Sequence, residues 1–197
     1  MMNTIHVSRV QARSFLSTLA ATLFLLLPTG CRSAPGGAGD VSLGTYYTQF
    51  PMQIDRDTCR STNYRGGTTA FLLPINSEVE FTGARRYRFN MRMEDGRIFR
   101  FEHIKKHTRD TPQASFDTFF GAEPVDLSGF TAAEQAAIEK GKPEVGMSRD
   151  AVLTACGPPP ATGTASLDAR SWKYWSTRFD TFLVHFDEDG KVSSIQE

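Results

Sequence analysis

The middle of the chain alternates apolar and polar residues in the way that short β-strands do. In the run RYRFNMRM, which begins at Arg86, every second residue is apolar, and RIFRFEHI, which begins at Arg97, is a second strand-like run. Asp95 and Gly96 between these runs are typical of a tight hairpin turn. We therefore predict a β-rich domain over residues 45–110, built as a meander of short strands.

The run LLPINSEVEF, from Leu72, places a proline turn before the next strand. In this respect the meander is similar to the small SH3-like barrels of bacterial envelope proteins, where a proline and a Gly-Thr pair often mark the turn. Asn76 and Ser77 take the place of the Gly-Thr pair, and the resemblance covers about forty residues. It implies a small SH3-like barrel.

Two short amphipathic helices are predicted next. Thr131 and Glu134 have the spacing of a capping box, and Gly141 suits the left-handed conformation that ends a helix. A second helix begins after Ser148, whose hydroxyl can cap it, and ends at Gly157 before three prolines. We expect Val152, Leu153 and Cys156 to share the apolar face of this second helix.

Three strand-like runs close the chain: SWKYWSTR, FDTFLVHFD and KVSSIQ. Asp189 and Gly190 join the last two runs as a hairpin turn. The sequence thus predicts an α+β fold, in which the small all-β meander precedes a domain of two helices and a three-stranded antiparallel sheet over residues 131–197.

Residues 111–130 separate the two predicted domains. Pro112, Pro124 and two glycines interrupt every regular period there. We predict a connector that packs its phenylalanines without regular structure.

The C-terminal runs VGMSRDAVLTACGPP, SWKYW and LVHFDEDGKV follow one another in a characteristic order. This order resembles the SmpA/OmlA family, the BamE-like lipoproteins, over residues 143–197. The matching positions include Gly146, Ser148, Gly157, Pro158, Trp172, Tyr174, Phe186 and Gly190. The resemblance implies a non-catalytic outer-membrane lipoprotein that supports assembly of β-barrel proteins by docking on other lipoproteins. Family members usually consist of little more than a signal peptide and this domain. The resemblance therefore does not account for residues 45–110.

The first thirty residues are predicted to be an export signal. Arg9 and Arg13 precede residues 15–27, a stretch of 13 residues without charge. A bilayer core of about 30 Å needs about 20 helical residues, so this stretch is too short to span it.

Cys31 follows two small residues and resembles the lipidated cysteine of a bacterial lipobox, although Pro28 stands where leucine is usual. Residues 31–44 are rich in Pro, Gly, Ser and Ala, as a flexible tether is. Arg32 stands where an aspartate would indicate inner-membrane retention. We therefore expect a protein held by its N-terminal lipid in the bacterial outer membrane, facing the periplasm.

The other two cysteines leave two alternatives open. Once Cys31 carries lipid, Cys59 and Cys156 form an even pair in an oxidising compartment, either bridged or buried as two apolar side chains. Cys156 ends a predicted helix, where the dipole disfavours a nucleophilic thiolate. Neither has a partner at metal-ligand spacing, and we expect His103 and His107 to be solvated rather than metal-bound.

The whole chain has 22 basic and 22 acidic residues, which predicts no general affinity for nucleic acid. Residues 85–109 nevertheless carry seven arginines and two lysines against three acidic residues. Strand alternation places Arg86, Arg88 and Arg92 on the face opposite Phe89 and Met91. The candidate residues for binding an anionic surface are Arg86, Arg88, Arg92, Lys105 and Lys106. The alternative is a solvated face that prevents edge pairing.

We find no nucleophile with its base, no paired catalytic carboxylates, no phosphate-binding glycine loop and no dinucleotide motif in the sequence. We therefore predict neither an enzyme nor a cofactor. The expected function is support of outer-membrane assembly or envelope integrity through contacts with other envelope proteins. The alternative is a module that binds peptidoglycan or anionic lipid. Secreted inhibitors share this fold, so fold alone does not decide.

Overall fold

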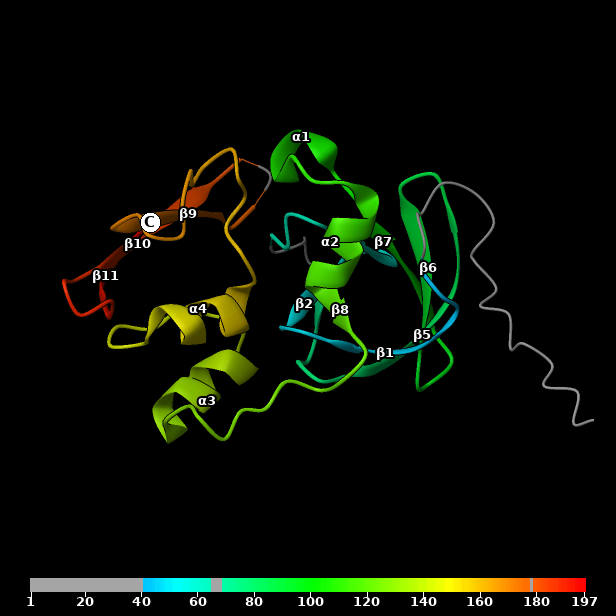
Figure 1. Ribbon diagram of the computed structural model, residues 1–197, viewed down its shortest axis with the longest axis horizontal. Coiled ribbons are helices and arrows are strands. Elements are labelled where there is room, and N and C mark those ends of the chain that lie inside the picture. Colours follow the sequence, from blue (N-terminus) through cyan, green and yellow to red (C-terminus); the bar gives the residue numbers. More distant parts are fainter. Residues whose placement is uncertain (1–40, 65–68, 178) are drawn as a thin grey trace, which may run out of the picture. The chain divides into compact units, whose positions relative to one another are not determined.

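The computed structural model describes residues 41–64, 69–177 and 179–197. The predicted signal, Cys31 and most of the predicted tether lie outside the described residues. Within them the fold is α+β, with a curled six-stranded sheet, a three-stranded antiparallel sheet, a two-stranded ladder and four helices (Figure 1).

The six-stranded sheet has the order β3-β7-β6-β5-β1-β8. Its strands are β1 (Gly44–Thr48), β3 (Thr58–Arg60), β5 (Glu78–Arg85), β6 (Arg88–Met93), β7 (Ile98–Glu102) and β8 (Phe120–Gly121). All neighbours are antiparallel except β3 and β7, which are parallel. A separate antiparallel ladder joins β2 (Met52–Ile54) to β4 (Phe71–Leu73). The predicted hairpin at Gly96 is confirmed, because the Gly96 N–H donates to the Met93 carbonyl at 2.9 Å.

Strand β6 shows why this sheet encloses a core. Phe89, Met91 and Met93 are buried, while Arg88, Asn90 and Arg92 between them are exposed. The alternation therefore directs one face inward, as the sequence predicts.

Helix α2 (Pro112–Phe119) lies where the sequence predicted a connector without regular structure, and that prediction was wrong. The Thr111 hydroxyl accepts the Ala114 N–H at 3.1 Å and caps the helix. Pro112 occupies the first helical position, where its missing N–H removes no helical hydrogen bond. Phe116 and Phe119 then pack against the sheet, with the Phe119 and Phe101 ring centroids 4.6 Å apart.

The C-terminal part contains the two helices and three strands in the predicted segments. They are α3 (Ala132–Glu139), α4 (Arg149–Cys156), β9 (Ser171–Trp175), β10 (Thr181–Phe186) and β11 (Val192–Gln196), with the sheet order β11-β10-β9. The capping box of Thr131 with Glu134 and the Ser148 cap are both confirmed. Gly141 has φ +62° after α3, as predicted.

A second hydrophobic cluster lies between these helices and the three-stranded sheet, around Trp172. The face that α4 buries differs in part from the predicted one. Ala151, Val152 and Ala155 are fully buried, while Leu153 and Cys156 lie at the margin of the cluster. Ala151, Val152 and Ala155 thus form the face with which α4 packs into the cluster.

The first hydrophobic cluster, around the curled sheet, contacts the end of α4. A Cβ atom added at Gly157 would lie 2.7 Å from the Phe50 ring, so glycine permits this approach. The Asn63 amide donates to the Pro51 and Cys156 carbonyls at 3.0 and 3.2 Å. None of the helices in the described part of the chain is long and apolar enough to cross a membrane.

Candidate functional site

One end of the six-stranded sheet brings together basic side chains from several strands. Strand β5 ends at Arg85, the turn to β6 begins with Arg86, and β6 starts at Arg88, opposite Arg85. Glu102 of β7 pairs with Arg88, and Arg60 of β3 pairs with Glu102, so both lie at this same end. The strand register therefore gathers cations that are far apart in the sequence.

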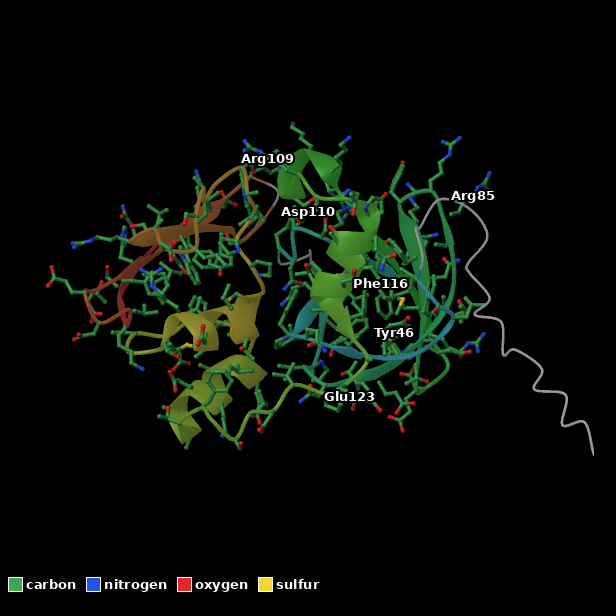
Figure 2. The ribbon with its side chains drawn as sticks, viewed as in Figure 1. Tyr46, Arg85, Arg109, Asp110, Phe116 and Glu123 are labelled. Atoms are coloured by element: carbon green, nitrogen blue, oxygen red, sulfur yellow. The ribbon has the colours of Figure 1, made fainter. Side chains whose placement is uncertain are left out.

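The single-turn helix α1 (Lys105–Thr108) adds two lysines to this end. The His103 N–H donates to the Tyr87 carbonyl at 2.9 Å and so holds the segment before α1 against the β5–β6 turn. We define the basic end as Arg60, Arg85, Arg86, Arg88, Lys105 and Lys106. In Figure 2 Arg85 lies on the upper side of the view and Glu123 on the lower side.

Ion pairs neutralise only part of the basic end. Glu102 contacts two guanidinium groups, that of Arg88 at 2.9 Å and that of Arg60 at 3.7 Å. Arg85, Arg86, Lys105 and Lys106 have no carboxylate within 4.0 Å in the described ranges. The basic end therefore keeps an excess of positive charge.

The structure places Arg86 and Arg92 differently from the other predicted binding residues. Arg86 has φ +58° in the hairpin turn, so the prediction that it lies on the strand face was wrong. Arg92 is on the outward face as predicted, but Glu80 of the neighbouring strand neutralises it at 2.7 Å. Glu78 and Glu80 precede the basic segment in sequence, so a charge count over residues 85–109 omits them.

The basic end also carries an exposed aromatic ring. Tyr87 is 42 % exposed between Arg86 and Arg88, and the Arg88 guanidinium lies 5.5 Å from the centre of its ring. A ring of this kind, with an apolar body and a polar tip, suits the boundary between water and lipid.

The chain reaches the sheet from the side of the basic end. Strand β1 begins at Gly44 opposite Phe81 and runs antiparallel to β5, which ends at Arg85. Residues 41–43, which precede β1, are therefore on the Arg85 side of the ladder. Val41 is only 2 % exposed, so the described chain is fixed in the core from its first residue.

Cys59 and Cys156 are not joined to each other by a disulfide in the structure. Cys59 is fully buried in the first hydrophobic cluster, whereas Cys156 packs against the second one. The structure therefore lends no support to the bridged alternative, which stays a prediction for mass measurement to test. Burial raises the pKa of the Cys59 thiol well above its usual range, which keeps it protonated and unreactive.

His103 is buried, and the prediction that it is solvated was wrong. Its Nδ1 lies 2.8 Å from the Ser115 hydroxyl of α2, because the helix missed in the sequence covers it. Burial lowers the pKa of His103. A serine beside an imidazole has the chemistry of a nucleophile with its base. The only sign of this pair in the sequence is the capping residue Thr111, which marks the start of the helix that carries Ser115.

Access limits what this serine and histidine can do. Ser115 lines a cavity of about 240 Å³ together with Asp110 and residues 158–161 and 164–167, yet the residue is only 2 % exposed. No group of three or more His, Cys, Asp or Glu side chains that could hold a metal ion occurs in the part of the chain that the structure describes.

The positions of the SmpA/OmlA resemblance hold α4 against the three-stranded sheet. Tyr174 donates its hydroxyl to the Gly157 carbonyl at 3.0 Å, and the Gly146 N–H donates to the Val192 carbonyl at 2.8 Å. The Trp172 and Phe186 rings meet with centroids 4.6 Å apart. The remaining positions are the Ser148 cap, the exposed Pro158 after α4 and the Gly190 turn. Each has a structural role in this fold.

No protein-family model, curated protein or solved structure matches this chain. The resemblance to the SmpA/OmlA family therefore rests on the order of sequence motifs. Of the predicted binding residues, the structure brings Arg86, Arg88, Lys105 and Lys106 to one end of a sheet, which makes the basic end the candidate site.

Proposed function

We propose that the protein is a non-catalytic lipoprotein of the bacterial outer membrane, facing the periplasm, whose basic end binds the anionic membrane surface beside its own lipid anchor. The observation that supports this role is the position of the basic end, on the side from which the chain enters β1. Cys31, the proposed site of lipidation, lies outside the described residues.

The length of the tether is compatible with this arrangement. Val41 is ten steps along the chain from Cys31, a span of at most about 35 Å when fully extended. Charges interact with a lipid surface over a Debye length of about 8 Å at physiological salt. The basic end is therefore within reach of the head groups next to the anchor.

The charge at the basic end is large enough to influence membrane contact. Each basic residue near an anionic surface contributes about 1 kcal/mol or less. Arg85, Arg86, Lys105 and Lys106 together then contribute up to about 4 kcal/mol. A lipid chain combined with a basic patch binds a membrane more firmly than either signal alone.

Sedimentation with lipid vesicles tests the proposal. A Cys31→Ala protein, which lacks the lipid, is expected to bind vesicles containing phosphatidylglycerol but not vesicles of phosphatidylcholine alone. Added salt should weaken this binding. Replacing Arg85, Arg86, Lys105 and Lys106 with glutamine should weaken it about 10- to 100-fold.

The matched control removes four cations that already have a carboxylate partner. These are Arg92, Arg97, Lys140 and Arg170, each replaced with glutamine. An equal loss of binding in this control would show that net charge, and not the basic end, is responsible. Purified peptidoglycan in place of vesicles distinguishes a cell-wall ligand from a lipid surface.

A second candidate function is support of β-barrel protein assembly through contacts with other envelope proteins. Two capped helices followed by a three-stranded sheet favour it, since the SmpA/OmlA resemblance implies this order. We propose accordingly that the C-terminal part is BamE-like and that the curled sheet is an SH3-like barrel. Affinity capture from envelope extracts, with native lipidation, should recover assembly factors. The candidate fails if none is recovered and deletion leaves barrel-protein levels and detergent sensitivity unchanged.

The absence of catalysis is part of the proposal and has its own test. A fluorophosphonate probe labels serines that a neighbouring base activates. Ser115 is expected to stay unlabelled because it lies on the buried face of α2. Labelling that disappears in a Ser115→Ala variant would identify a hydrolase instead.

A further inference from the structure

The turn between β9 and β10 presents the most exposed large apolar side chain among the described residues. Phe179, in this turn, is 76 % exposed. The Thr177 hydroxyl accepts the N–H groups of Phe179 and Asp180 at 3.1 and 3.0 Å, and it donates to the Asp180 carboxylate at 2.7 Å. These hydrogen bonds order the turn, so it presents the phenyl ring to solvent from a fixed backbone.

The β9–β10 turn lies beside α1, the helix that carries two lysines of the basic end. Trp175 ends β9 directly before the turn, and its ring centroid is 6.3 Å from that of His107 in α1. Lys105 and Lys106 immediately precede His107 in the same helix. The segment that presents Phe179 is therefore continuous with the basic end.

A second exposed aromatic residue lies in the basic end itself. Tyr87 and Arg86 form the turn between β5 and β6, and Tyr87 is 42 % exposed. The Tyr87 carbonyl accepts the His103 N–H at 2.9 Å, two residues before α1 begins. The segment around α1 thus contacts both turns, so two aromatic side chains accompany its lysines.

Aromatic rings distinguish the kinds of anionic surface that cations alone do not. A bilayer places its phosphates next to an apolar phase, and aromatic residues are enriched at that boundary. A soluble polyanion has charge but no apolar phase to receive a phenyl ring. In the sequence Arg178 precedes Phe179 and Asp180 follows it, so these neighbours add no net charge. Any gain in binding at Phe179 is therefore apolar.

We propose that Phe179, together with Tyr87, enters the interfacial region of an anionic phospholipid bilayer while the basic end binds the lipid phosphates. This inference rests on the proposed function and specifies the partner as a bilayer. The two contributions respond differently to salt, because ions screen the attraction between charges but do not weaken the burial of an aromatic ring.

Sedimentation with vesicles containing phosphatidylglycerol tests the role of the phenyl ring. In the Cys31→Ala protein, Phe179→Ala should raise the apparent Kd for these vesicles about 5- to 10-fold, by the same factor at low and at high salt. Its affinity for soluble sodium polyphosphate should stay unchanged. Phe179→Leu keeps an apolar side chain and should retain most of the vesicle affinity. Tyr87→Ala should also weaken vesicle binding, by a smaller factor because its ring is less exposed.

Val145→Ala is the matched control for an exposed apolar side chain. Val145 is 67 % exposed and precedes Gly146, whose N–H donates to the Val192 carbonyl at 2.8 Å. Val192 begins β11, at the end of the three-stranded sheet opposite the β9–β10 turn. The vesicle affinity of Val145→Ala should therefore equal that of the parent protein.

A fluorophore at the turn measures insertion directly. Phe179→Cys, made in a protein that also carries Cys31→Ala and Cys156→Ser, can be labelled with nitrobenzoxadiazole, since Cys59 is fully buried. Its emission should rise and shift to shorter wavelength when phosphatidylglycerol vesicles are added. The same label at Val145→Cys should show neither change.

The outcomes separate this inference from the proposed function. The inference is overturned if the parent protein binds vesicles and Phe179→Ala binds them equally well, or if the label at residue 179 stays in water. An equal loss in Val145→Ala, or an equal loss of polyphosphate binding, also overturns it. Each of these results leaves the basic end as a membrane site. If the parent protein does not bind the vesicles at all, the proposed function fails, and the inference fails with it.

Discussion

One carboxylate oxygen of Glu134 accepts hydrogen bonds from both the backbone N–H and the hydroxyl of Ser148, at 2.8 and 2.9 Å. Its other oxygen accepts the N–H and the hydroxyl of Thr131, at 3.1 and 3.0 Å. Thr131 caps α3 and Ser148 caps α4. A single buried carboxylate therefore joins the first turns of both helices.

This arrangement predicts a loss of stability in acid. The backbone N–H of Ser148, followed by the donors of Thr131 and the Ser148 hydroxyl, lowers the pKa of Glu134 from 4.5 to about 2. The stabilisation is complete above the unfolded pKa of 4.5 and is lost as the pH falls through about 2. We expect this group to remove roughly 3 kcal/mol from the free energy of unfolding over that range. Urea denaturation at a series of pH values measures it.

A Glu134→Gln variant separates this carboxylate from the others. It should be less stable at pH 7 by about 2 to 3 kcal/mol, because an amide nitrogen faces donors where an oxygen accepted them. Its stability should also fall less steeply in acid. The control is Glu139→Gln, which changes an exposed carboxylate of the same helix. Equal pH dependence in wild type and Glu134→Gln would refute the assignment.

The close approach of Gly157 to Phe50 predicts that alanine is poorly tolerated there. Gly157 has φ +75° and ψ 178°, a region nearly restricted to glycine that costs other residues about 1 to 3 kcal/mol, and the new Cβ would also lie 2.7 Å from the ring. Overpacking adds about 1 to 3 kcal/mol. Gly157→Ala should therefore lower the Tm clearly in a thermal denaturation experiment.

Gly146→Ala is the matched control for that substitution. Gly146 also has a positive φ, +92°, but a Cβ there meets nothing within 4 Å. Gly146→Ala should therefore lose only the stability that corresponds to the strained backbone conformation. If the two variants lose equal stability, the contact with Phe50 is not a steric constraint.

The thiols should differ in reactivity. Reduction should leave the mass of the protein unchanged, since Cys59 and Cys156 are not bridged to each other. Iodoacetamide should modify Cys156, at the margin of its cluster, faster than Cys59, whose burial raises its pKa. Mass spectrometry before and after unfolding in urea gives both rates. A mass increase of two protons on reduction would restore the disulfide alternative.

Asn76 is expected to be essential for the connection to the segment after β8. Its amide oxygen accepts the Val125 N–H at 2.7 Å and its amide nitrogen donates to the Val125 carbonyl at 3.0 Å. Asn76→Ala removes both bonds and places alanine at φ +62°, for a combined loss of about 2 to 4 kcal/mol. Asn76→Gly loses the bonds without the backbone strain, so chemical denaturation should rank it between wild type and Asn76→Ala.

Local sequence signals predicted much of this fold because they act between near neighbours. The alternation around Phe89 and Met91 gave the correct inward face of β6, and Thr131 with Glu134 gave the start of α3. The sequence did not reveal that Glu134 also holds Ser148, because that contact depends on how α3 and α4 pack.

The wrong predictions concern residues that can play two structural roles, or residues whose partner lies elsewhere in the sequence. Pro112 usually interrupts regular structure, but after a capping threonine it begins α2. The burial of His103 followed from that missed helix. Arg92 remained a candidate because its partner Glu80 comes from the preceding strand.

The position of β1 between β5 and β8 has a mechanical consequence. A pull on the chain ahead of Val41 is transmitted along the axis of β1, while its hydrogen bonds to both neighbours run across that axis. The load therefore acts in shear and is shared by the whole ladder, so the bonds do not open one at a time. If the residues before Val41 tether the protein to a membrane as proposed, this arrangement resists extraction of β1 under load on the tether.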